Sequence, residues 1–325
     1  MLKMKGSIIL KVKKLGKKSN IFSRNAECWL SAVIAAVIMV FAYAVWKFFP
    51  FGENIILRMD LYHQYAPLYG EFIERVFGGD SLLYSFTSGL GSGFLGNYFN
   101  YLSSPTLFIV LLFGHFNLPE AIAAVVLVKA SASAYTFTYF LGKITKKSDV
   151  STAAFGLMYA FCGYFVAYYW NIMWLDAMVA FPLVMLGVWY IINKHKPVMY
   201  VISLAYVMMT NYYMAYMTCL LSVIFFLYFY FSEHTMGEKL GNKDYIIKPK
   251  YKKTLGFNFF NSRFLTTGFT FAGSSLLAAL IACFSLLPVV FILSGSSATN
   301  SNFPSTFSTY FNVFDFLANH LASVE

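Results

Sequence analysis

The stretch WLSAVIAAVIMVFAYAVWKFF, residues 29–49, is an almost unbroken apolar run, and it decides the fold class. A helix needs roughly 20 such residues to cross the hydrocarbon core of a membrane. Eight Lys and Arg residues precede the run and it lacks a small-residue cleavage site, which is typical of a retained signal anchor. The whole chain of 325 residues is 59% hydrophobic and only 12% charged. This composition indicates an integral membrane protein rather than a soluble one.

Five more apolar runs follow along the chain. They cover residues 121–142, 151–169, 177–193, 198–231 and 264–293. The run over residues 198–231 is too long for one helix, and the polar residues of TNYY, 210–213, predict a break into two short helices. A further apolar segment, 102–114, has 13 residues, which is too short to cross, so we expect a re-entrant or juxtamembrane helix. The sequence therefore predicts an all-α, polytopic transmembrane helical bundle of about seven spans.

The positive residues indicate which loops face the cytoplasm. Twenty of the 24 Lys and Arg residues lie in residues 1–28, 143–149, 193–197 and 232–263. Cytoplasmic loops are enriched in Lys and Arg, so we expect a cytoplasmic basic N-terminus over 1–28, a cytoplasmic loop over 232–263 and a large external first loop over 50–120. This distribution accounts for the net charge of +10 without a nucleic-acid partner.

The large external loop is expected to be folded and to carry interfacial helices. Residues 61–77 separate into an apolar and a polar arc on a helical wheel, which predicts a helix lying flat on the membrane surface. Pro67 predicts either a kink or a helix that begins near it. The four glycines of TSGLGSGFLGN, residues 87–97, permit tight turns and close backbone approach.

Polar residues on the predicted external side are the candidates for a functional site. Asp60 and Asp176 are candidates for a catalytic carboxylate, because a carboxylate can act as a general base. The candidates for substrate binding are Arg58, His63, Gln64, Arg75, Lys129, Asn171 and Trp174. A long segment of chain separates the candidates of the first loop from those at 171–176, but the predicted topology returns both groups to one face, where they could share one cleft.

Structural interpretations of the same residues compete with the functional ones. Asp60 could cap the N-terminus of the interfacial helix. Trp174 could belong to the aromatic belt at the membrane interface, and Asp176 could hydrate a turn beside that belt. The polar arc of residues 61–77 could be only a solvated face, formed by Glu71, Glu74 and Arg75.

Lys129 lies within a predicted span, where a lysine costs about 2.5–3.5 kcal/mol on insertion. It either snorkels to the outer interface or faces the protein interior as an anion-binding cation suited to a lipid phosphate. The two interpretations differ in where the ammonium group lies.

Neither cysteines nor histidines form a metal-binding pattern. The four cysteines lie in or beside apolar segments without CxxC spacing, which argues against a zinc site and a disulfide framework. Asp60 and His63 could together ligate a divalent metal, but two candidate ligands three residues apart are poor evidence. We therefore predict no cofactor and assign no metal-ligating residue.

Four motifs in this chain resemble the YfhO-type family of bacterial membrane proteins. They are DLYHQYAPLY (60–69), LYSFTSGLGSGFLGNYFNYLSSP (83–105), NLPEA (117–121) and YWNIMWLDAM (169–178), and the resemblance runs from about residue 49 to the C-terminus. Members of that family resemble glycosyltransferases of the C-type membrane fold. Those enzymes use polyprenyl-phosphate sugars to glycosylate envelope polymers such as lipoteichoic acid outside the cytoplasmic membrane.

The resemblance implies a transmembrane glycosyltransferase-like domain over residues 29–325 in a multi-pass protein of the bacterial cell membrane. It places the catalytic carboxylate of the first external loop at Asp60. The implied partners are a lipid-linked sugar donor, an envelope polymer as acceptor and membrane lipids. Family members are usually longer, with a C-terminal external domain, so we expect a truncated member or an N-terminal fragment.

Two other functions stay open. A transporter or flippase of a lipid-linked envelope precursor would fit the broken helices at 210–213 and the intramembrane Lys129. Against it, the hydropathy order shows no inverted repeat and the polar residues concentrate in an external loop. The other alternative is a non-catalytic scaffold of an envelope assembly complex.

Overall fold

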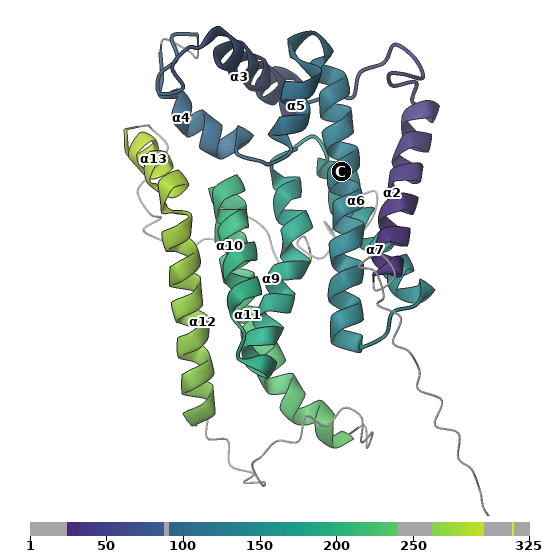
Figure 1. The fold of residues 1–325 in the computed structure, drawn as a ribbon, viewed down its shortest axis with the longest axis vertical. Helices are drawn as coiled ribbons and strands as arrows, with labels where there is room; N and C mark the ends of the chain where they lie inside the picture. The colour runs from purple at the N-terminus through teal and green to yellow at the C-terminus, as the bar shows by residue number, and fades with distance from the viewer. Residues whose placement is uncertain (1–24, 88–90, 240–261, 296–313, 315–325) are drawn as a thin grey trace, which may run out of the picture.

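The computed structural model describes residues 25–87, 91–239, 262–295 and 314. Within these residues the chain forms helices and no β-strand, which confirms the predicted all-α bundle. Figure 1 shows long helices side by side, with a layer of short helices across one end. Most of the basic N-terminus and of the loop predicted at 232–263 lies outside the described residues.

Six helical segments in the described part of the chain are long and apolar enough to cross a membrane. The helix α10 (Val198–Thr210) has only 13 residues and packs against α9, α11 and α12. Of the seven predicted spans, six are therefore full-length and the one at α10 is short. The long segments are α2 (Ala26–Val45), α6 (Leu118–Thr145), α7 with α8 (Val150–Ala160, Gly163–Tyr168), α9 (Trp174–Lys194), α11 (Tyr212–Lys239) and α12 (Ser262–Ile281).

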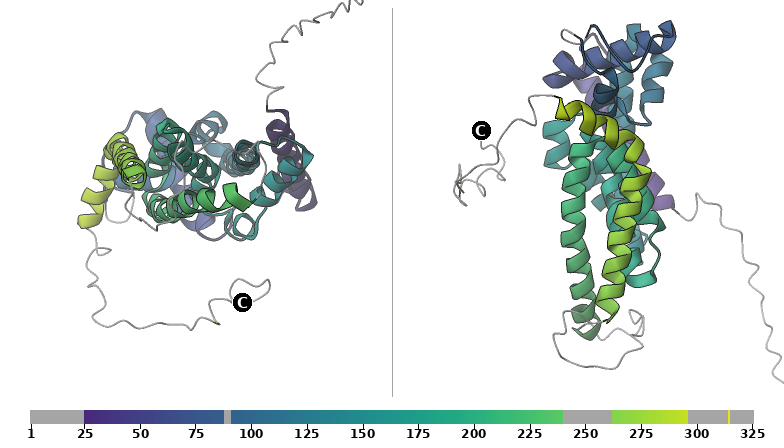
Figure 2. Two further views of the ribbon diagram at one scale, coloured as in Figure 1. Left: turned by 90° about the horizontal axis from the view of Figure 1, so that it is seen from below. Right: turned by 90° about the vertical axis from the view of Figure 1, so that its left-hand side faces the viewer.

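Helices α6 and α9 form the centre of the bundle and are its most buried spans. The helix α6 contacts α2, α7 and α9, and α9 in turn contacts α10 and α11. Seen from below in Figure 2, the helices spread in a band with α12 toward one edge and α2 toward the other. Gly187 allows α9 to approach α10 closely, because a Cβ atom there would lie 2.5 Å from the backbone of Tyr200.

The break predicted at TNYY is present between α10 and α11. The helix α10 ends at Thr210, and Asn211 separates it from α11. The buried Asn211 side chain accepts a hydrogen bond from the backbone N–H of Met214 (2.8 Å) and donates one to the carbonyl of Asn100 (3.0 Å). The amide therefore caps α11 and ties the break to the layer of short helices.

The first loop forms this end layer, which Figures 1 and 2 show across the bundle. With seven residues, α5 is too short to cross a membrane, as expected for residues 102–114. The elements of the layer are η1 (Leu61–Tyr65), α3 (Ala66–Gly78), α4 (Phe94–Asn97), η2 (Tyr98–Leu102), α5 (Leu107–Phe113) and η3 (His115–Asn117).

The helix α13 (Cys283–Ser294) follows α12 and packs against this end layer. Its Ile292 side chain lies over the glycine-rich segment, where a Cβ atom at Gly96 would come within 2.7 Å of it. Gly93 lies under the same side chain. The glycines therefore provide the close approach that their composition predicts.

Residues 61–77 are helical as predicted, but most of their apolar arc packs against the bundle. Tyr65, Tyr69, Phe72 and Ile73 are buried in one hydrophobic cluster with residues of α6 and η2. For these four residues the expectation that the arc rests on the membrane surface is wrong, because they cover the end of the bundle, whereas Tyr62 and Val76 of the same arc are exposed. Pro67 occupies the first turn of α3, so the helix begins near it rather than kinking there.

Candidate functional site

Four polar side chains lie on η1 and on the turn before it. They are Arg58, Asp60, His63 and Gln64, all exposed, and we call them the polar cap. Asp60 occupies the N-cap position of η1, but its side chain accepts no capping hydrogen bond. Within the described part of the chain, the charged groups of Arg58 and Asp60 have no hydrogen-bond or ion-pair partner. Both charges are therefore available to a ligand.

The backbone beside the polar cap is unusual in two respects. Met59 has a φ of 50°, in the left-handed region, which costs a residue with a side chain roughly 1–2 kcal/mol. The following element, η1, is a π-helix, a rare form that occurs frequently at functional sites. Such conformations persist only where the surrounding structure holds them, and they cluster at active sites. The backbone thus singles out the polar cap independently of its charges.

Three residues behind the polar cap join it to the turn before α9. Gln64 donates a hydrogen bond to the hydroxyl of Tyr101 (3.1 Å), and the ring of Tyr101 lies 5.4 Å from that of Tyr65. The Tyr65 hydroxyl donates to the side-chain oxygen of the buried Asn171 (2.8 Å). Burial, together with the nearby charge of Asp60, raises the pKa of Tyr65. The structure therefore brings Asn171 next to the polar cap, across 106 residues of chain.

A buried ion pair lies among α6, α9 and α10. Lys129 Nζ is 2.7 Å from Asp176 Oδ2, and both side chains are 2% exposed. Lys129 also donates to the carbonyl of Ile172 (2.9 Å), and Asp176 Oδ1 accepts hydrogen bonds from Ser104 (2.9 Å) and Tyr206 (2.7 Å). We call Lys129 and Asp176 the inner ion pair. Its hydrogen bonds join both helices to α10 and to the turn before α5.

This geometry decides between the interpretations of the two residues. The ammonium of Lys129 faces the protein interior, so the snorkelling interpretation is wrong. Asp176 is buried, so it does not hydrate a turn, and its place in the first turn of α9 suits a negative charge. A phosphate could reach Lys129, and a proton could reach Asp176, only if the inner ion pair opened. Their roles in phosphate binding and catalysis stay predictions.

Arg75 holds a loop of the end layer in place. Its guanidinium is 2.9 Å from Glu71 and donates to the carbonyls of Ser81 (2.6 Å) and Tyr84 (3.1 Å). The same group lies 5.0 Å from the ring centre of Phe94. Its side chain is 13% exposed, so the solvated-face interpretation is wrong for Arg75. Its predicted role in substrate binding stays a prediction, since its donors already serve the loop.

Glu71, the ion-pair partner of Arg75, contacts the same loop. It accepts hydrogen bonds from the hydroxyls of Ser85 and Thr87. Burial by itself would raise the pKa of Glu71, but these bonds and Arg75 outweigh it and hold the pKa below the ordinary glutamate value. Glu71 is therefore not a solvated residue either, whereas Glu74 is, with 67% of its side chain exposed.

Trp174 lies at the start of α9 among other aromatic residues. Its ring is 6.2 Å from the rings of Tyr168 and of Tyr213, and it stacks on the latter. The backbone N–H of Trp174 donates to the carbonyl of Asn171 (2.8 Å). Trp174 is thus adjacent to the residues behind the polar cap, and its aromatic neighbours suit an interfacial belt as well.

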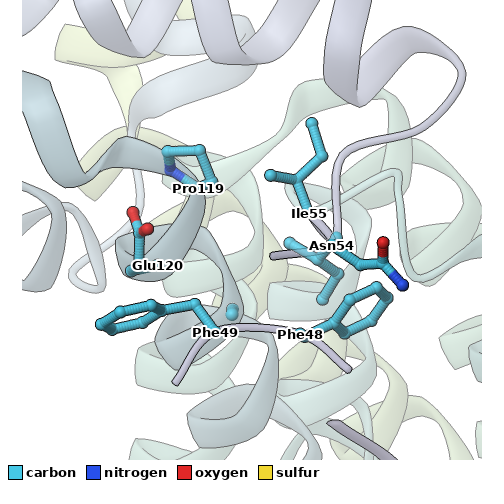
Figure 3. A pocket seen from close by; sticks show the side chains of 8 residues that line it. Phe48, Phe49, Asn54, Ile55, Pro119 and Glu120 are labelled. Atoms are coloured by element: carbon cyan, nitrogen blue, oxygen red, sulfur yellow. The ribbon is translucent and has the colours of Figure 1, made fainter. Parts of the chain in front are cut away.

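A separate small pocket lies where α6 begins (Figure 3), and it shares no lining residue with the polar cap. Glu120 and Pro119 face Asn54 and Ile55 across it. One carboxylate oxygen of Glu120 is buried without a hydrogen-bond partner among the described residues. The carboxylate is also in the first turn of α6, where the helix dipole favours it.

No three His, Cys, Asp or Glu side chains gather in the described part of the chain in a way that could hold a metal.

Four side chains that hydrogen-bond behind the polar cap and around the inner ion pair were not singled out from the sequence. Tyr65, Tyr101 and Ser104 lie inside the quoted motifs 60–69 and 83–105, so the motifs contained the signal without distinguishing them. Tyr206 lies in an apolar run, where a tyrosine is indistinguishable from any other aromatic residue. Only its hydrogen bond to Asp176 reveals its role.

A family model described as "Bacterial membrane protein YfhO" matches residues 31–324, nearly the whole chain. No curated protein and no solved structure matches the chain significantly.

Proposed function

Because the chain belongs to the YfhO family of bacterial membrane proteins, we propose that it transfers a sugar from a polyprenyl-phosphate donor to a cell-envelope polymer such as lipoteichoic acid, on the external face of the membrane. The donor stays in the membrane while the acceptor is polar, so the site must lie at the membrane surface. The observation that carries the proposal is the exposed carboxylate of Asp60 beside Arg58, at one end of an apolar bundle, where neither charge has a partner among the residues that the structure describes.

In the proposed reaction, the acceptor hydroxyl oxygen attacks the anomeric carbon of the sugar. The bond between that carbon and the phosphate oxygen breaks, and polyprenyl phosphate leaves with the electron pair. Asp60 accepts the proton of the attacking hydroxyl as general base. Arg58 stabilises the charge that grows on the leaving phosphate. His63 and Gln64 orient the sugar by hydrogen bonds, and Trp174, whose backbone N–H donates to the carbonyl of Asn171, provides an aromatic surface.

Lys129 is only the second candidate for phosphate binding, and Asp176 is only the second candidate for the general base. Each neutralises the other at 2.7 Å in the protein interior, whereas Arg58 and Asp60 are exposed. We therefore assign the phosphate first to Arg58 and the proton first to Asp60.

The experiment uses the purified full-length protein in liposomes with a polyprenyl phosphate carrying a radiolabelled sugar and with lipoteichoic acid as acceptor. We expect the label to enter the polymer and an equal amount of polyprenyl phosphate to be released. A transporter would move the intact donor across the bilayer without breaking its bond, and a scaffold would do neither. Mass analysis of envelope polymers from cells with and without the gene provides the parallel test. No transfer in the liposomes and unchanged polymers in the cells would contradict the proposal.

A further inference from the structure

The inner ion pair contacts both segments that support the polar cap from behind. We propose that Lys129 and Asp176 are positioning residues that hold Tyr101 and Asn171 in the geometry the polar cap requires. The proposal rests on the proposed function, because it assigns these residues a role in the same site. It differs from phosphate binding or proton transfer, in which either residue would contact substrate.

The first connection runs from Asp176 to Tyr101. Asp176 Oδ1 accepts a hydrogen bond from the hydroxyl of Ser104 at 2.9 Å. Ser104 stands three residues after Tyr101, and the fully buried Leu102 lies between them. The backbone N–H of Ser104 also donates to the carbonyl of Leu102 at 2.7 Å, which tightens this turn. The carboxylate therefore fixes the end of η2, whose Tyr101 hydroxyl accepts the hydrogen bond from Gln64.

The second connection runs from Lys129 to Asn171. The ammonium donates to the carbonyl of Ile172 at 2.9 Å, and Ile172 is fully buried. Asn171 is its chain neighbour and accepts the hydrogen bond from the Tyr65 hydroxyl. One ammonium group therefore fixes the turn before α9, and that turn supports η1. The two connections converge on adjacent residues of the same π-helix, Gln64 and Tyr65.

The chemistry of the pair favours positioning over simple stabilisation. Two charges buried in a protein lose their hydration, and apolar residues of similar volume often stabilise a fold equally well or better. Hydrogen bonds from a charged group, in contrast, fix distance and direction. An ion pair with three further hydrogen-bond partners on separate segments is therefore suited to define geometry. A displacement of about 1 Å at a reacting group can cost roughly 10²-fold in rate.

The experiment removes both charges together, in the full chain reconstituted in liposomes. The double variant Lys129→Met/Asp176→Leu leaves no unpaired buried ion, but Ser104, Tyr206 and the Ile172 carbonyl each lose a hydrogen-bond partner. We therefore expect a folded protein of near-normal abundance whose melting temperature is lowered by several degrees. We expect amide hydrogen exchange in peptides 98–106 and 168–173 to become about tenfold faster or more. We expect kcat for sugar transfer to fall about 10²-fold, with a much smaller change in the donor KM.

Ser104 and Ser133 provide matched single variants. Ser104→Ala should accelerate exchange in peptide 98–106 only, and Ser104→Thr, which keeps the hydroxyl, should restore it. Ser133 is buried one helical turn beyond Lys129 on α6, and Ser133→Ala should leave exchange and kcat unchanged. If the double variant fails to fold, the exchange rates of the Ser104→Ala and Ser104→Thr variants test the proposal instead.

Wild-type exchange in both peptides of the double variant would overturn the proposal, whether or not kcat falls, because a fall in kcat alone would indicate direct contact with substrate. A Ser104→Ala protein with unchanged exchange would overturn it as well. If the wild-type protein itself transfers no sugar, the proposed function fails. The exchange measurements still decide in that case whether the inner ion pair holds these two segments.

Discussion

Asp60 is the residue on which the proposed chemistry depends most directly. Asn has nearly the same shape and caps helices about as well as Asp, but it cannot accept a proton. We expect Asp60→Asn to lower sugar transfer by roughly 10²–10⁴-fold, the usual contribution of general base catalysis. The measurement is the transfer rate in liposomes, normalised to the amount of reconstituted protein.

Glu74→Gln is the matched control for this substitution. Glu74 is also an exposed carboxylate of the end layer, and its 3.1 Å contact with His115 lies outside the polar cap. We expect this variant to transfer at the wild-type rate. An Asp60→Asn protein that does the same would exclude Asp60 as the base, and Asp176→Asn would be the next variant to measure.

The sequence predicts single residues well where the signal is local. The exposed charges of the polar cap follow from their place after an apolar run, and the cost of a lysine in a span indicates that Lys129 needs a special environment. Its partner could not be predicted, because Asp176 is 47 residues away and on another helix. The same limit applies to Arg75, whose partners include two backbone carbonyls that only the folded loop presents.

Among the helices, the close crossing of α9 and α10 gives the sharpest test of packing. A methyl group at Gly187 would overlap the backbone of Tyr200, which cannot move as a flexible side chain could. We expect Gly187→Ala to destabilise the protein by about 1–3 kcal/mol, the usual cost of overpacking. Thermal or denaturant unfolding of the detergent-solubilised protein measures it.

Gly268 on α12 provides the comparison, because a Cβ atom there would have no neighbour within 4 Å. Gly268→Ala should be neutral or stabilise the helix by up to about 1 kcal/mol. Equal effects of the two substitutions would show that helix propensity rather than the crossing determines the result.

At the level of helices, periodicity and breakers predict most boundaries. The apolar runs, Pro67 and the TNYY interruption all correspond to observed features. The partner of an apolar face is a different matter, since protein and lipid are both apolar. The apolar arc of residues 61–77 therefore predicts correctly that Tyr65, Tyr69, Phe72 and Ile73 are buried, but wrongly that lipid covers them, since they pack against protein.

For the whole molecule, orientation in the membrane is the main prediction that the charge distribution makes. The helix α6 has 28 residues, about 42 Å, so Asn117 and Lys146 at its two ends should lie on opposite sides of the bilayer. Each position is replaced by a single cysteine in a cysteine-free chain. The cysteine at 117 should react with an impermeant maleimide present on the outside, and the cysteine at 146 with the same reagent present on the inside. Both positions are exposed. Labelling of both from the outside would contradict the predicted topology.

The short helix α10 has a consequence for the surrounding lipid. Its 13 residues rise about 20 Å, roughly two thirds of a typical hydrocarbon core, and Asn211 follows directly. This is a hydrophobic mismatch, which a bilayer relieves by thinning locally. The protein should therefore work best in thin membranes, and sugar transfer should slow as liposome phospholipids with longer acyl chains replace shorter ones. A rate independent of chain length would show that neighbouring helices shield α10 from the lipid.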